Sequence, residues 1–437
     1  MRMLGRLGLM AIAIGLPIAV SAQLLPGVPI GQQLPGLPSV GGVVRGVDQT
    51  LDNVSALPRA VTRLAQDRLA RIDALLRAHP DAIALDDRGD PARAREVVVT
   101  DPDAALIDRA SEAGFALIEQ ATIDGVDIGY ARFHTPPGKS LPAALKAMRK
   151  LAGKRAVSAD QLHFESGIVK GGAARADSPN PFPEGEGPGR SLPRLGIIDG
   201  GVGANAGLAG SITRAGFAKG TGGGSDHGTA IASLLVGTPS IHGAAPGAPL
   251  WAADVYGTDP AGGNAVAIAR ALGWMVREQV PLVVVSLVGP PNPLLDRVVG
   301  AARAKGTLVV AAVGNDGPAA PPAYPASYPG VVAVTGVDGK DRALIEAGRA
   351  THLDYAAPGA DMLAADAQGR SVKVRGTSFA APLAAAVIAR RYRQPNAVMI
   401  SAALRATDAT ARDLGPRGPD KRYGRGLVCG DCRTPAR

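Results

Sequence analysis

Aromatic residues make up only 3% of this 437-residue chain, so its core has to be packed mainly from Ala, Val, Leu and Ile. The 57 glycines and 36 prolines place many turn signals between the apolar segments. With 46% apolar and 19% charged residues the chain can bury a core, which excludes a disordered tail and a coiled coil. The composition favours Ala-rich α/β layers, and the length predicts about three units.

The chain also lacks a clustered basic stripe and a long apolar run. The net charge is +9 at pH 7, but Lys and Arg are spread along the sequence without interleaved aromatic residues. This distribution argues against nucleic acid as a partner. No apolar run reaches the roughly 20 residues that a membrane-spanning helix needs, so we expect no membrane span.

The first residues predict export. Arg2 and Arg6 precede an apolar run over 7–20, and Val20-Ser21-Ala22 places small residues where a signal peptidase reads them. The alternative, a membrane anchor, is disfavoured because the run is too short. We therefore expect a signal peptide over 1–22, cleavage after Ala22, and a periplasmic or extracellular protein. Because Arg2 and Arg6 are not adjacent, a twin-arginine route has no support.

Only two cysteines occur, Cys429 and Cys432, close to the C-terminus. The pair cannot complete a zinc site, which takes four ligands, and no histidine is nearby. A redox Cys-x-x-Cys motif would sit at a helix N-terminus in a thioredoxin-like unit, whereas this chain ends five residues later. In an oxidising compartment the pattern predicts a small local disulfide.

The N-terminal half divides into four segments. Residues 23–57 repeat Pro-Gly motifs and predict a flexible linker, and the spacing of apolar residues predicts an amphipathic helix over 58–79. Further elements are predicted in the order β-α-β-β-α-β, the ferredoxin-like arrangement, with Asp124-Gly125 as a tight hairpin turn. These strands and helices are expected at 95–100, 103–113, 115–121, 126–133, 141–151 and 156–164. Residues 165–193, rich in Gly, Pro and Ser, predict a second linker.

Residues 194–437 predict an α/β domain. Apolar runs alternate with helical stretches, which indicates a doubly wound parallel sheet with helices on both faces. The strands are expected at 195–198, 250–255, 282–287, 307–313 and 331–337, and two of the helices at 263–277 and 293–304.

Four polar residues in this domain form a constellation suited to acyl transfer. Asp199 ends a buried strand, His227 starts a small-residue helix, Asn315 follows another buried strand, and Ser378 precedes a long Ala-rich helix. Each alone is more typical of a cap or a turn. Together they supply a carboxylate, a base, an oxyanion donor and a nucleophile. The chain order Asp, His, Ser differs from that of the α/β-hydrolases.

At these residues the sequence resembles the subtilases, the subtilisin-like serine peptidases. Its motifs are Ile198-Asp199-Gly200, His227-Gly228-Thr229-Ala230, Ala312-Val313-Gly314-Asn315 and Gly376-Thr377-Ser378-Phe379-Ala380-Ala381-Pro382. The resemblance covers about 194–428 and implies a triad of Asp199, His227 and Ser378, with Asn315 and the Ser378 N–H as oxyanion donors. Gly200 and Ala230 depart from the family pattern, which has Thr or Ser and a second His there.

The resemblance also implies how substrates bind. An extended peptide is expected to pair with the strand over 282–287, and the pocket for the side chain before the cleaved bond is expected to be narrow. Its walls would be Ser286, Leu287, Val288, Gly289, Ala312, Val313, Gly314 and Ala323. Val288, Val313 and Ala323 add methyl groups where the family has smaller residues, so we expect small side chains to be preferred. If Val288 or Val313 turned away from the pocket, a broad aromatic preference would survive.

Residues 58–164 are expected to be a propeptide that acts as inhibitor and folding aid, because subtilases commonly carry a ferredoxin-like one. Self-cleavage is expected within 165–193, where residues 171–174 offer small side chains. The chemistry requires no cofactor, and the resemblance makes structural calcium compatible, although Asp254, Asp259 and Asp361 form no complete oxygen cage. The alternative function, a non-catalytic subtilase fold, is disfavoured because all four catalytic positions are present.

Overall fold

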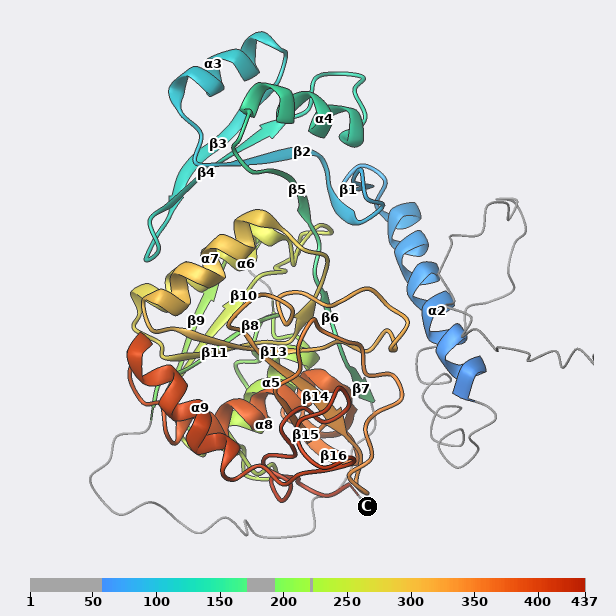
Figure 1. Ribbon diagram of the computed structural model, residues 1–437, viewed down its shortest axis with the longest axis vertical. Coiled ribbons are helices and arrows are strands. Elements are labelled where there is room, and N and C mark those ends of the chain that lie inside the picture. The colour runs from blue at the N-terminus through green and yellow to red at the C-terminus, as the bar shows by residue number, and fades with distance from the viewer. Residues whose placement is uncertain (1–56, 171–192, 221–222, 437) are drawn as a thin grey trace, which may run out of the picture. The chain divides into compact units, whose positions relative to one another are not determined.

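The computed structural model describes residues 57–170, 193–220 and 223–436. The predicted signal peptide, its cleavage position, almost all of the 23–57 linker and residues 171–174 lie outside these ranges. Among the residues within them, no helix is both long enough and apolar enough to cross a bilayer. Figure 1 shows the described elements with their labels.

The N-terminal part of the described chain forms an antiparallel sheet with two helices packed on it (Figure 1). The order β-α-β-β-α-β is confirmed, and β5 pairs with β2, which pairs with β4, which pairs with β3, as in a ferredoxin-like unit. A short strand, β1, adds to β2 and was not predicted. The elements are α2 (Leu57–Ala78), β1 (Ile83–Leu85), β2 (Pro91–Thr100), α3 (Ala104–Glu112), β3 (Ala116–Ile123), β4 (Ile128–His134), α4 (Leu141–Ala152) and β5 (Val157–Gln161).

The hairpin between β3 and β4 differs from the predicted tight turn. Its loop covers four residues, 124–127, so β4 begins at Ile128 instead of residue 126. Gly125 has φ +82°, and a Cβ there would lie 2.3 Å from the carbonyl oxygen of Gly273. The close approach of this loop to a helix of the C-terminal domain explains why glycine is needed and why the turn is longer.

The C-terminal domain is built on a seven-stranded parallel sheet in the order β15-β14-β13-β11-β8-β10-β9. Helices α5 (Asp226–Val236) and α8 (Thr377–Ala389) lie on one side of the sheet, and α6 (Ala265–Arg277) and α7 (Pro293–Ala304) lie on the other (Figure 1). A hydrophobic cluster packs each pair of helices against the sheet. The predicted doubly wound fold is therefore confirmed. The strands are β8 (Leu195–Asp199), β9 (Ile212–Gly216), β10 (Leu250–Asp254), β11 (Leu282–Val285), β13 (Leu308–Ala312), β14 (Val332–Val337) and β15 (Tyr355–Pro358).

Helices α5, α6 and α7 lie in the connections that lead to β10, β11 and β13. Helices α8 and α9 (Ile400–Asp408) follow the last strand of this sheet, with a 3₁₀ turn, η2 (Ala397–Met399), directly before α9. Strands β9 and β15 and helix α9 were not predicted, because their segments are short or lack continuous apolar runs.

Residues 162–170 connect the two folded units and contain two short strands, whereas the sequence analysis ended its last strand at residue 164 and began a linker at residue 165. Strand β6 (Phe164–Glu165) pairs antiparallel with β12 (Leu287–Val288). Strand β7 (Ile168–Lys170) pairs antiparallel with β17 (Ser371–Arg375), which also pairs with β16 (Met362–Ala365). These strands have no sequence signal of their own, since their partners lie more than 100 residues away.

Hydrogen bonds and ion pairs join the ferredoxin-like unit to α6 and α7. Asp160 accepts a hydrogen bond from the N–H of Val266 in the first turn of α6, at 2.9 Å. The Asn292 amide donates to Gln161 Oε1 at 2.6 Å, and Arg93 pairs with Asp259 at 2.6 Å. These contacts give several of the polar groups buried between the two units a partner across the contact.

Candidate active site

Asp199 and His227 form a buried hydrogen-bonded pair. Asp199 is the last residue of β8 and His227 is the second residue of α5, and their side chains are 1% and 3% exposed. His227 Nδ1 lies 2.8 Å from Asp199 Oδ1, which also accepts the N–H of Gly200. This contact orients the imidazole and leaves Nε2 directed elsewhere.

The structure gives a reason for glycine at position 200, where the family pattern has Thr or Ser. A Cβ at Gly200 would lie 2.4 Å from the hydroxyl of Ser225, which caps α5 by accepting the N–H of Gly228 at 2.8 Å. The space that a side chain at 200 would need is therefore taken by the cap that starts the His227 helix. Ala230, the other departure, is fully buried against the sheet.

Ser378 is the second residue of α8 and is completely buried in the described structure. Pro382 lies four residues later and has no N–H, so it cannot donate to the Ser378 carbonyl as the helix pattern would require. The Ser286 hydroxyl donates to that carbonyl instead, at 2.9 Å. Ser286 thus ties the start of α8 to the end of β11.

Asn315 is held beside Ser378 by the first residue of α8. Its Oδ1 accepts the N–H of Thr377 at 3.0 Å, and the Thr377 hydroxyl donates to the Gly314 carbonyl at 3.1 Å. These contacts leave the Asn315 amide N–H free to point at the bond beside Ser378. The first-turn N–H groups of α8 have no partners within the helix, so the Ser378 N–H is a second donor at the same place.

The cleft is filled by the chain itself. Pairing of β6 with β12 places Glu165 opposite Leu287 and Phe164 opposite Val288. On the other side of this segment His163 donates its N–H to the Gly263 carbonyl at 2.8 Å. An extended strand held on both sides in this way is the arrangement expected for a bound peptide.

The Ser166–Gly167 peptide bond lies against Asn315 and Ser378, two of the four predicted catalytic residues. The Ser166 carbonyl accepts a hydrogen bond from the Asn315 amide, and Ser166 Oγ lies 2.8 Å from Ser378 Oγ. The Ser166 N–H donates to the Ser286 carbonyl at 3.3 Å. A Cβ at Gly167 would lie 3.1 Å from Ser378 Oγ. This bond lies inside the predicted processing region 165–193 but before residues 171–174, and the only signal that could have singled it out was a small Ser-Gly pair directly after the last predicted strand.

In the described structure the Ser378 hydroxyl is not hydrogen-bonded to its predicted base. The Ser378 hydroxyl is bonded to that of Ser166, while His227 Nε2 has no hydrogen-bond partner among the described residues. Burial lowers the pKa of His227, but the Asp199 carboxylate, with Glu165, outweighs burial and leaves the pKa above its ordinary value.

Glu165 adds a third ionisable group beside this pair. Ligand atoms of Glu165, Asp199 and His227 lie within 4.8 Å of one another. Burial raises the pKa of Glu165 to about 7, against the lowering effect of His227. Two of the three residues belong to the predicted triad and the third belongs to the segment in the cleft. Their closeness therefore follows from these roles and does not call for a bound metal ion.

The predicted substrate-binding residues divide into two groups. Ser286, Leu287, Val288 and Gly289 contact residues 163–166, and a Cβ at Gly289 would lie 2.6 Å from the His163 ring. The predicted pairing of a peptide with 282–287 holds only for the end of that segment, because Ser286 and Leu287 pair with residues 165–166 whereas β11 lies inside the sheet between β13 and β8.

The remaining pocket residues are buried near the end of β13. Ala312 packs in the cluster with α8, Val313 packs in the cluster with α6 and α7, and Ala323 is 4% exposed. The side chain of Val288 lies against Gly314, because a Cβ at Gly314 would be 3.2 Å from Val288 Cγ2. Val288 therefore points toward the wall formed by the 312–315 segment.

The acidic residues considered for calcium lie in separate contacts. Asp254 accepts the N–H groups of Tyr256 and Gly257, Asp259 pairs with Arg93, and Asp361 accepts the N–H of Gly339. Calcium binding stays a prediction from the family resemblance.

The two cysteines are joined in the structure as a Cys429–Cys432 disulfide. The tail beyond them is also held by hydrogen bonds, since Thr434 accepts the N–H of Leu363 at 2.8 Å and that of His242 at 2.8 Å. The tail is thus fastened at more points than the sequence pattern indicated.

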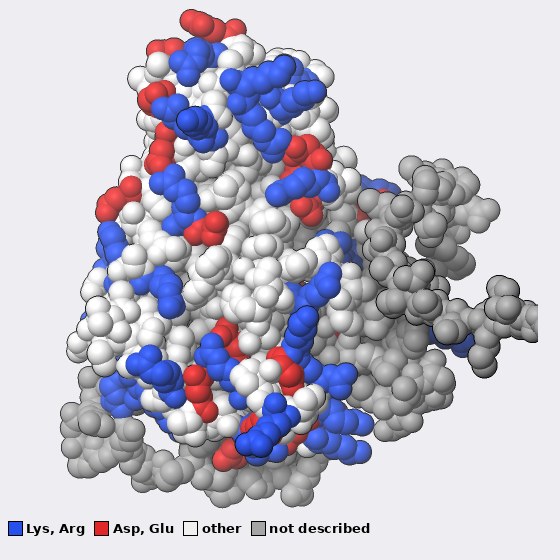
Figure 2. Space-filling model, in the orientation of Figure 1, with Lys and Arg blue, Asp and Glu red and all other residues white. Residues whose placement is uncertain are grey.

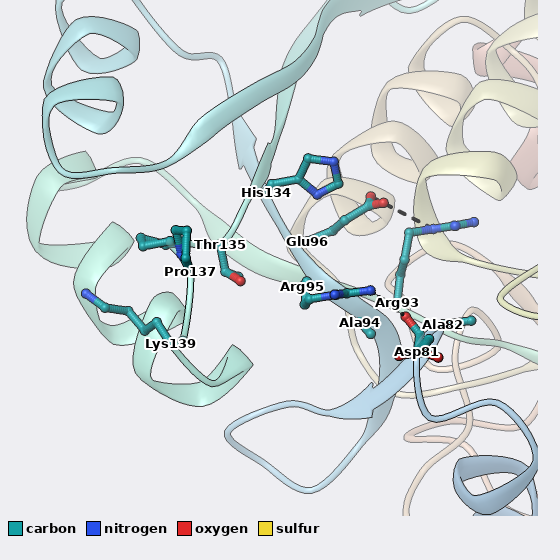
Figure 3. A pocket seen from close by; sticks show the side chains of 12 residues that line it. Asp81, Ala82, Arg93, Ala94, Arg95, Glu96, His134, Thr135, Pro137 and Lys139 are labelled. Atoms are coloured by element: carbon teal, nitrogen blue, oxygen red, sulfur yellow. Dashed lines mark hydrogen bonds and ion pairs between the residues drawn. The ribbon is translucent and has the colours of Figure 1, made fainter.

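A separate cavity of about 660 Å³ lies in the ferredoxin-like unit. Figure 3 shows Arg93, Arg95, Glu96, His134 and Lys139 among its lining residues, with an ion pair between Arg93 and Glu96. It holds none of the four predicted catalytic residues. On the face seen in Figure 2, basic and acidic side chains are interspersed and form no continuous basic surface.

Comparison with known proteins decides the family. A model of the subtilase family matches residues 205–426, about half of the chain. The chain belongs to the subtilase family. His227, Asn315 and Ser378 lie inside the matched range, and Asp199 precedes it by six residues.

Several curated subtilases are similar to this chain. Subtilisin DY from Bacillus licheniformis is 30% identical over 248 residues, which cover 54% of this chain and 88% of that protein. The minor extracellular protease Epr from Bacillus subtilis (strain 168) is 29% identical over 245 residues, covering 54% of this chain but only 37% of that protein. The chain thus spans little more than a third of the length of Epr.

Solved subtilase structures share the fold. Fervidolysin from Fervidobacterium pennivorans aligns with a TM-score of 0.59 at 17% identity, covering 80% of this chain and 62% of that chain. The epidermin leader peptide processing protease from Staphylococcus aureus aligns with a TM-score of 0.59 at 15% identity, covering 78% and 97%. Because residues 194–437 are little more than half of this chain, both alignments extend into the N-terminal residues.

Proposed function

We propose that this subtilase is an exported serine endopeptidase made as a self-processing zymogen, and that its first substrate is its own Ser166–Gly167 bond. One observation carries the proposal. The carbonyl of Ser166 accepts a hydrogen bond from Asn315 while its neighbouring atoms lie against Ser378. A carbonyl bound by an oxyanion donor, in a residue whose side chain contacts the nucleophile, is placed close to the position needed for attack.

The reaction starts when Ser378 Oγ gives up its bond to Ser166 Oγ and attacks the Ser166 carbonyl carbon. His227 Nε2 takes the Ser378 proton, and Asp199 stabilises the imidazolium. The oxyanion is bound by the Asn315 amide and the Ser378 N–H, and losing one such donor costs on the order of a hundred- to a thousand-fold in turnover. Collapse breaks the bond to Gly167, whose amine takes the proton from His227. Water then hydrolyses the ester between Ser166 and Ser378.

The substrate class follows from the residues in the cleft. Ser166 is small, in line with the narrow pocket expected from Val288, and residues 164–165 bind through backbone pairing that any extended peptide can make. The enzyme should therefore cleave unfolded or loop segments after small residues. Matched peptides with Ala or Phe before the cleaved bond test this, and a higher kcat/KM for Phe would contradict it.

Export is proposed from the features of residues 1–22, and a curated relative is described as an extracellular protease. An oxidising compartment would keep the Cys429–Cys432 disulfide formed.

The decisive experiment compares the wild-type chain with Ser378→Ala. The wild-type chain should yield a mature protein that begins at Gly167 and is labelled by a fluorophosphonate probe. Ser378→Ala should accumulate as the full chain after signal removal, whereas Ser111→Ala, at an exposed serine of α3, should mature normally. If Ser378→Ala matures identically without added protease, self-processing is wrong. If the mature wild-type protein is not labelled by the probe, the fold is a non-catalytic module.

A further inference from the structure

Helix α2 lies outside the ferredoxin-like unit, yet it contacts both the loop that carries Asn315 and the peptide in the cleft. The residues of α2 that make these contacts are Leu64, Arg68, Arg71, Leu75 and Leu76, which recur at helical spacing along one side. Nothing in the proposed reaction uses this helix.

The first contact is with residues 315–317, which we call the oxyanion loop. Arg68 Nε lies 3.4 Å from Asp316 Oδ2, and Arg71 pairs with the other oxygen of the same carboxylate. Asp316 directly follows Asn315, whose amide binds the Ser166 carbonyl. Leu64 is 7% exposed and packs on Gly317, because a Cβ at that glycine would lie 3.1 Å from Leu64 Cδ1.

The second contact is with the segment that fills the cleft. Leu75 and Leu76 pack in a cluster that contains Leu162 and Phe164, together with Ala261 of the C-terminal domain. Phe164 belongs to β6 and lies two residues before the Ser166 carbonyl. One face of α2 therefore spans from the peptide in the cleft to the loop that carries the oxyanion donor.

We propose that α2 is an inhibitory strap, which holds the N-terminal segment on the active site after Ser166–Gly167 has been cut. The inference rests on the proposed function, since a strap matters only if that bond is cleaved. The oxyanion loop is its docking surface, and the occupant is a basic amphipathic helix of this same chain.

The physical reason is that cleavage removes the covalent link but none of these contacts. Segment 57–166 would then stay bound through β6, through its interface with α6 and α7, and through α2. The strap adds two ion pairs and apolar burial on a surface that the other contacts do not reach. It also packs in the same cluster as Phe164, so a competing substrate that displaces the β6 strand has to disturb these contacts as well.

The test follows two events in the full chain: cleavage, seen by gel and N-terminal sequencing, and the later appearance of activity on a peptide substrate. Arg68→Glu/Arg71→Glu places like charges beside Asp316. Cleavage should proceed as in wild type. Activity should appear about tenfold faster, because the cut segment loses the modest free energy of these contacts and dissociates sooner.

The matched control is Arg59→Glu/Arg63→Glu, which makes the same charge change at exposed positions of the same helix. It should keep the wild-type delay. Adding Asp316→Lys to the Arg68→Glu/Arg71→Glu chain restores opposite charges and should restore the delay. The activity of each chain is divided by its own final activity after full release. A change in turnover then does not appear as a change in the delay.

The outcomes separate the two proposals. If no chain is cut at Ser166–Gly167, the proposed self-processing fails. If all chains are cut but the delay is the same in wild type and Arg68→Glu/Arg71→Glu, the strap is wrong while self-processing stands. A delay shortened equally by the control variant would also overturn the strap, because the effect would then come from net charge.

Discussion

At the scale of single residues, the cleft accepts only a narrow set of side chains around the bond it holds. A Cβ at Gly167 would lie 2.7 Å from the ring of Phe379, which is itself fully buried and 5.5 Å from the His227 ring. Gly376, with φ +145°, faces the same segment, and a Cβ there would lie 2.8 Å from the Gly167 Cα. Two glycines thus let the peptide backbone pass close to the start of α8.

We expect Gly167→Val to block the proposed processing although all four proposed catalytic residues remain. The branched side chain would push the bond away from Ser378, and a displacement of about 1 Å can cost on the order of a hundred-fold in rate. Gly167→Ala should show a smaller defect, which provides a graded control for folding. Gel analysis of the secreted chains measures the effect, and normal cleavage of Gly167→Val between 166 and 167 would contradict it.

The Glu165 carboxyl predicts a pH dependence of release. Its pKa is about 7 in the cleft and 4.5 as the ordinary value, so the bound state takes up a proton. Binding should be strongest below pH 4.5, weaken as the pH rises toward 7, and stay constant above that. Release of the cut segment should therefore accelerate over this window by about tenfold, allowing for partial coupling to His227.

Glu165→Gln removes this titration and should flatten the profile between pH 4.5 and 7. The release rates of the wild-type and Glu165→Gln chains have to be compared as a ratio at each pH, because the titration of His163 changes binding in the opposite direction. Burial lowers the pKa of His163 to about 4, so its contribution to binding is lost as the pH falls. A ratio that does not change with pH would show that Glu165 does not titrate in this range.

At the scale of elements, the two folded units complete each other's hydrogen bonding. Helix α6 begins at Ala265, and two of its first N–H groups are satisfied by Asn264 of its own loop and by Asp160 of β5. Asn292 caps α7 and also donates its amide to Gln161. The ends of α6 and α7 are therefore partly built by the N-terminal unit.

Asp160→Ala should weaken this contact without touching the cleft. Losing a cap costs about 1 kcal/mol, and Val266 would keep a buried N–H without a partner. The thermal midpoint of the Ser378→Ala chain should fall by a few degrees, about 2–4 °C. Asp108→Ala, at an exposed position of α3, is the control. An unchanged midpoint would mean that water replaces the carboxylate.

At the scale of the whole molecule, the C-terminal domain depends on pairings between distant segments. Strand β8 pairs with β10 and β11, and every neighbouring pair in the seven-stranded sheet is parallel and joined by a crossover. Sheets of this kind fold slowly, because long loops close before their contacts form. The ferredoxin-like unit has local antiparallel hairpins and packs on α6 and α7, so it can order these helices early.

We therefore expect residues 167–437 to refold at least about tenfold more slowly alone than within the full chain. Both chains carry Ser378→Ala, so that cleavage does not interfere. Recovery of near-ultraviolet circular dichroism after dilution from denaturant is the measurement. Equal rates would show that the N-terminal unit inhibits but does not assist folding.

Most of the fold could be predicted from the sequence alone, and the same sequence patterns supply the four residues proposed to be catalytic. Asp199, His227, Asn315 and Ser378 each sit in a local pattern, a buried strand end or a helix start, that carries its own signal. The β-α-β-β-α-β order was likewise readable from hydrophobic periodicity, although the 124–127 loop was longer than a tight turn because Gly125 has to meet α6.

Only the tertiary structure decided which peptide bond lies in the cleft and what surrounds it. The hydroxyls of Ser166 and Ser378 are 212 residues apart in the sequence, and β6 and β7 form only because β12 and β17 pair with them. The pKa of Glu165 and the contacts of α2 with Asp316 likewise depend on burial and charge brought from other segments. Local patterns determine which groups the chain carries, whereas long-range packing determines which of them meet.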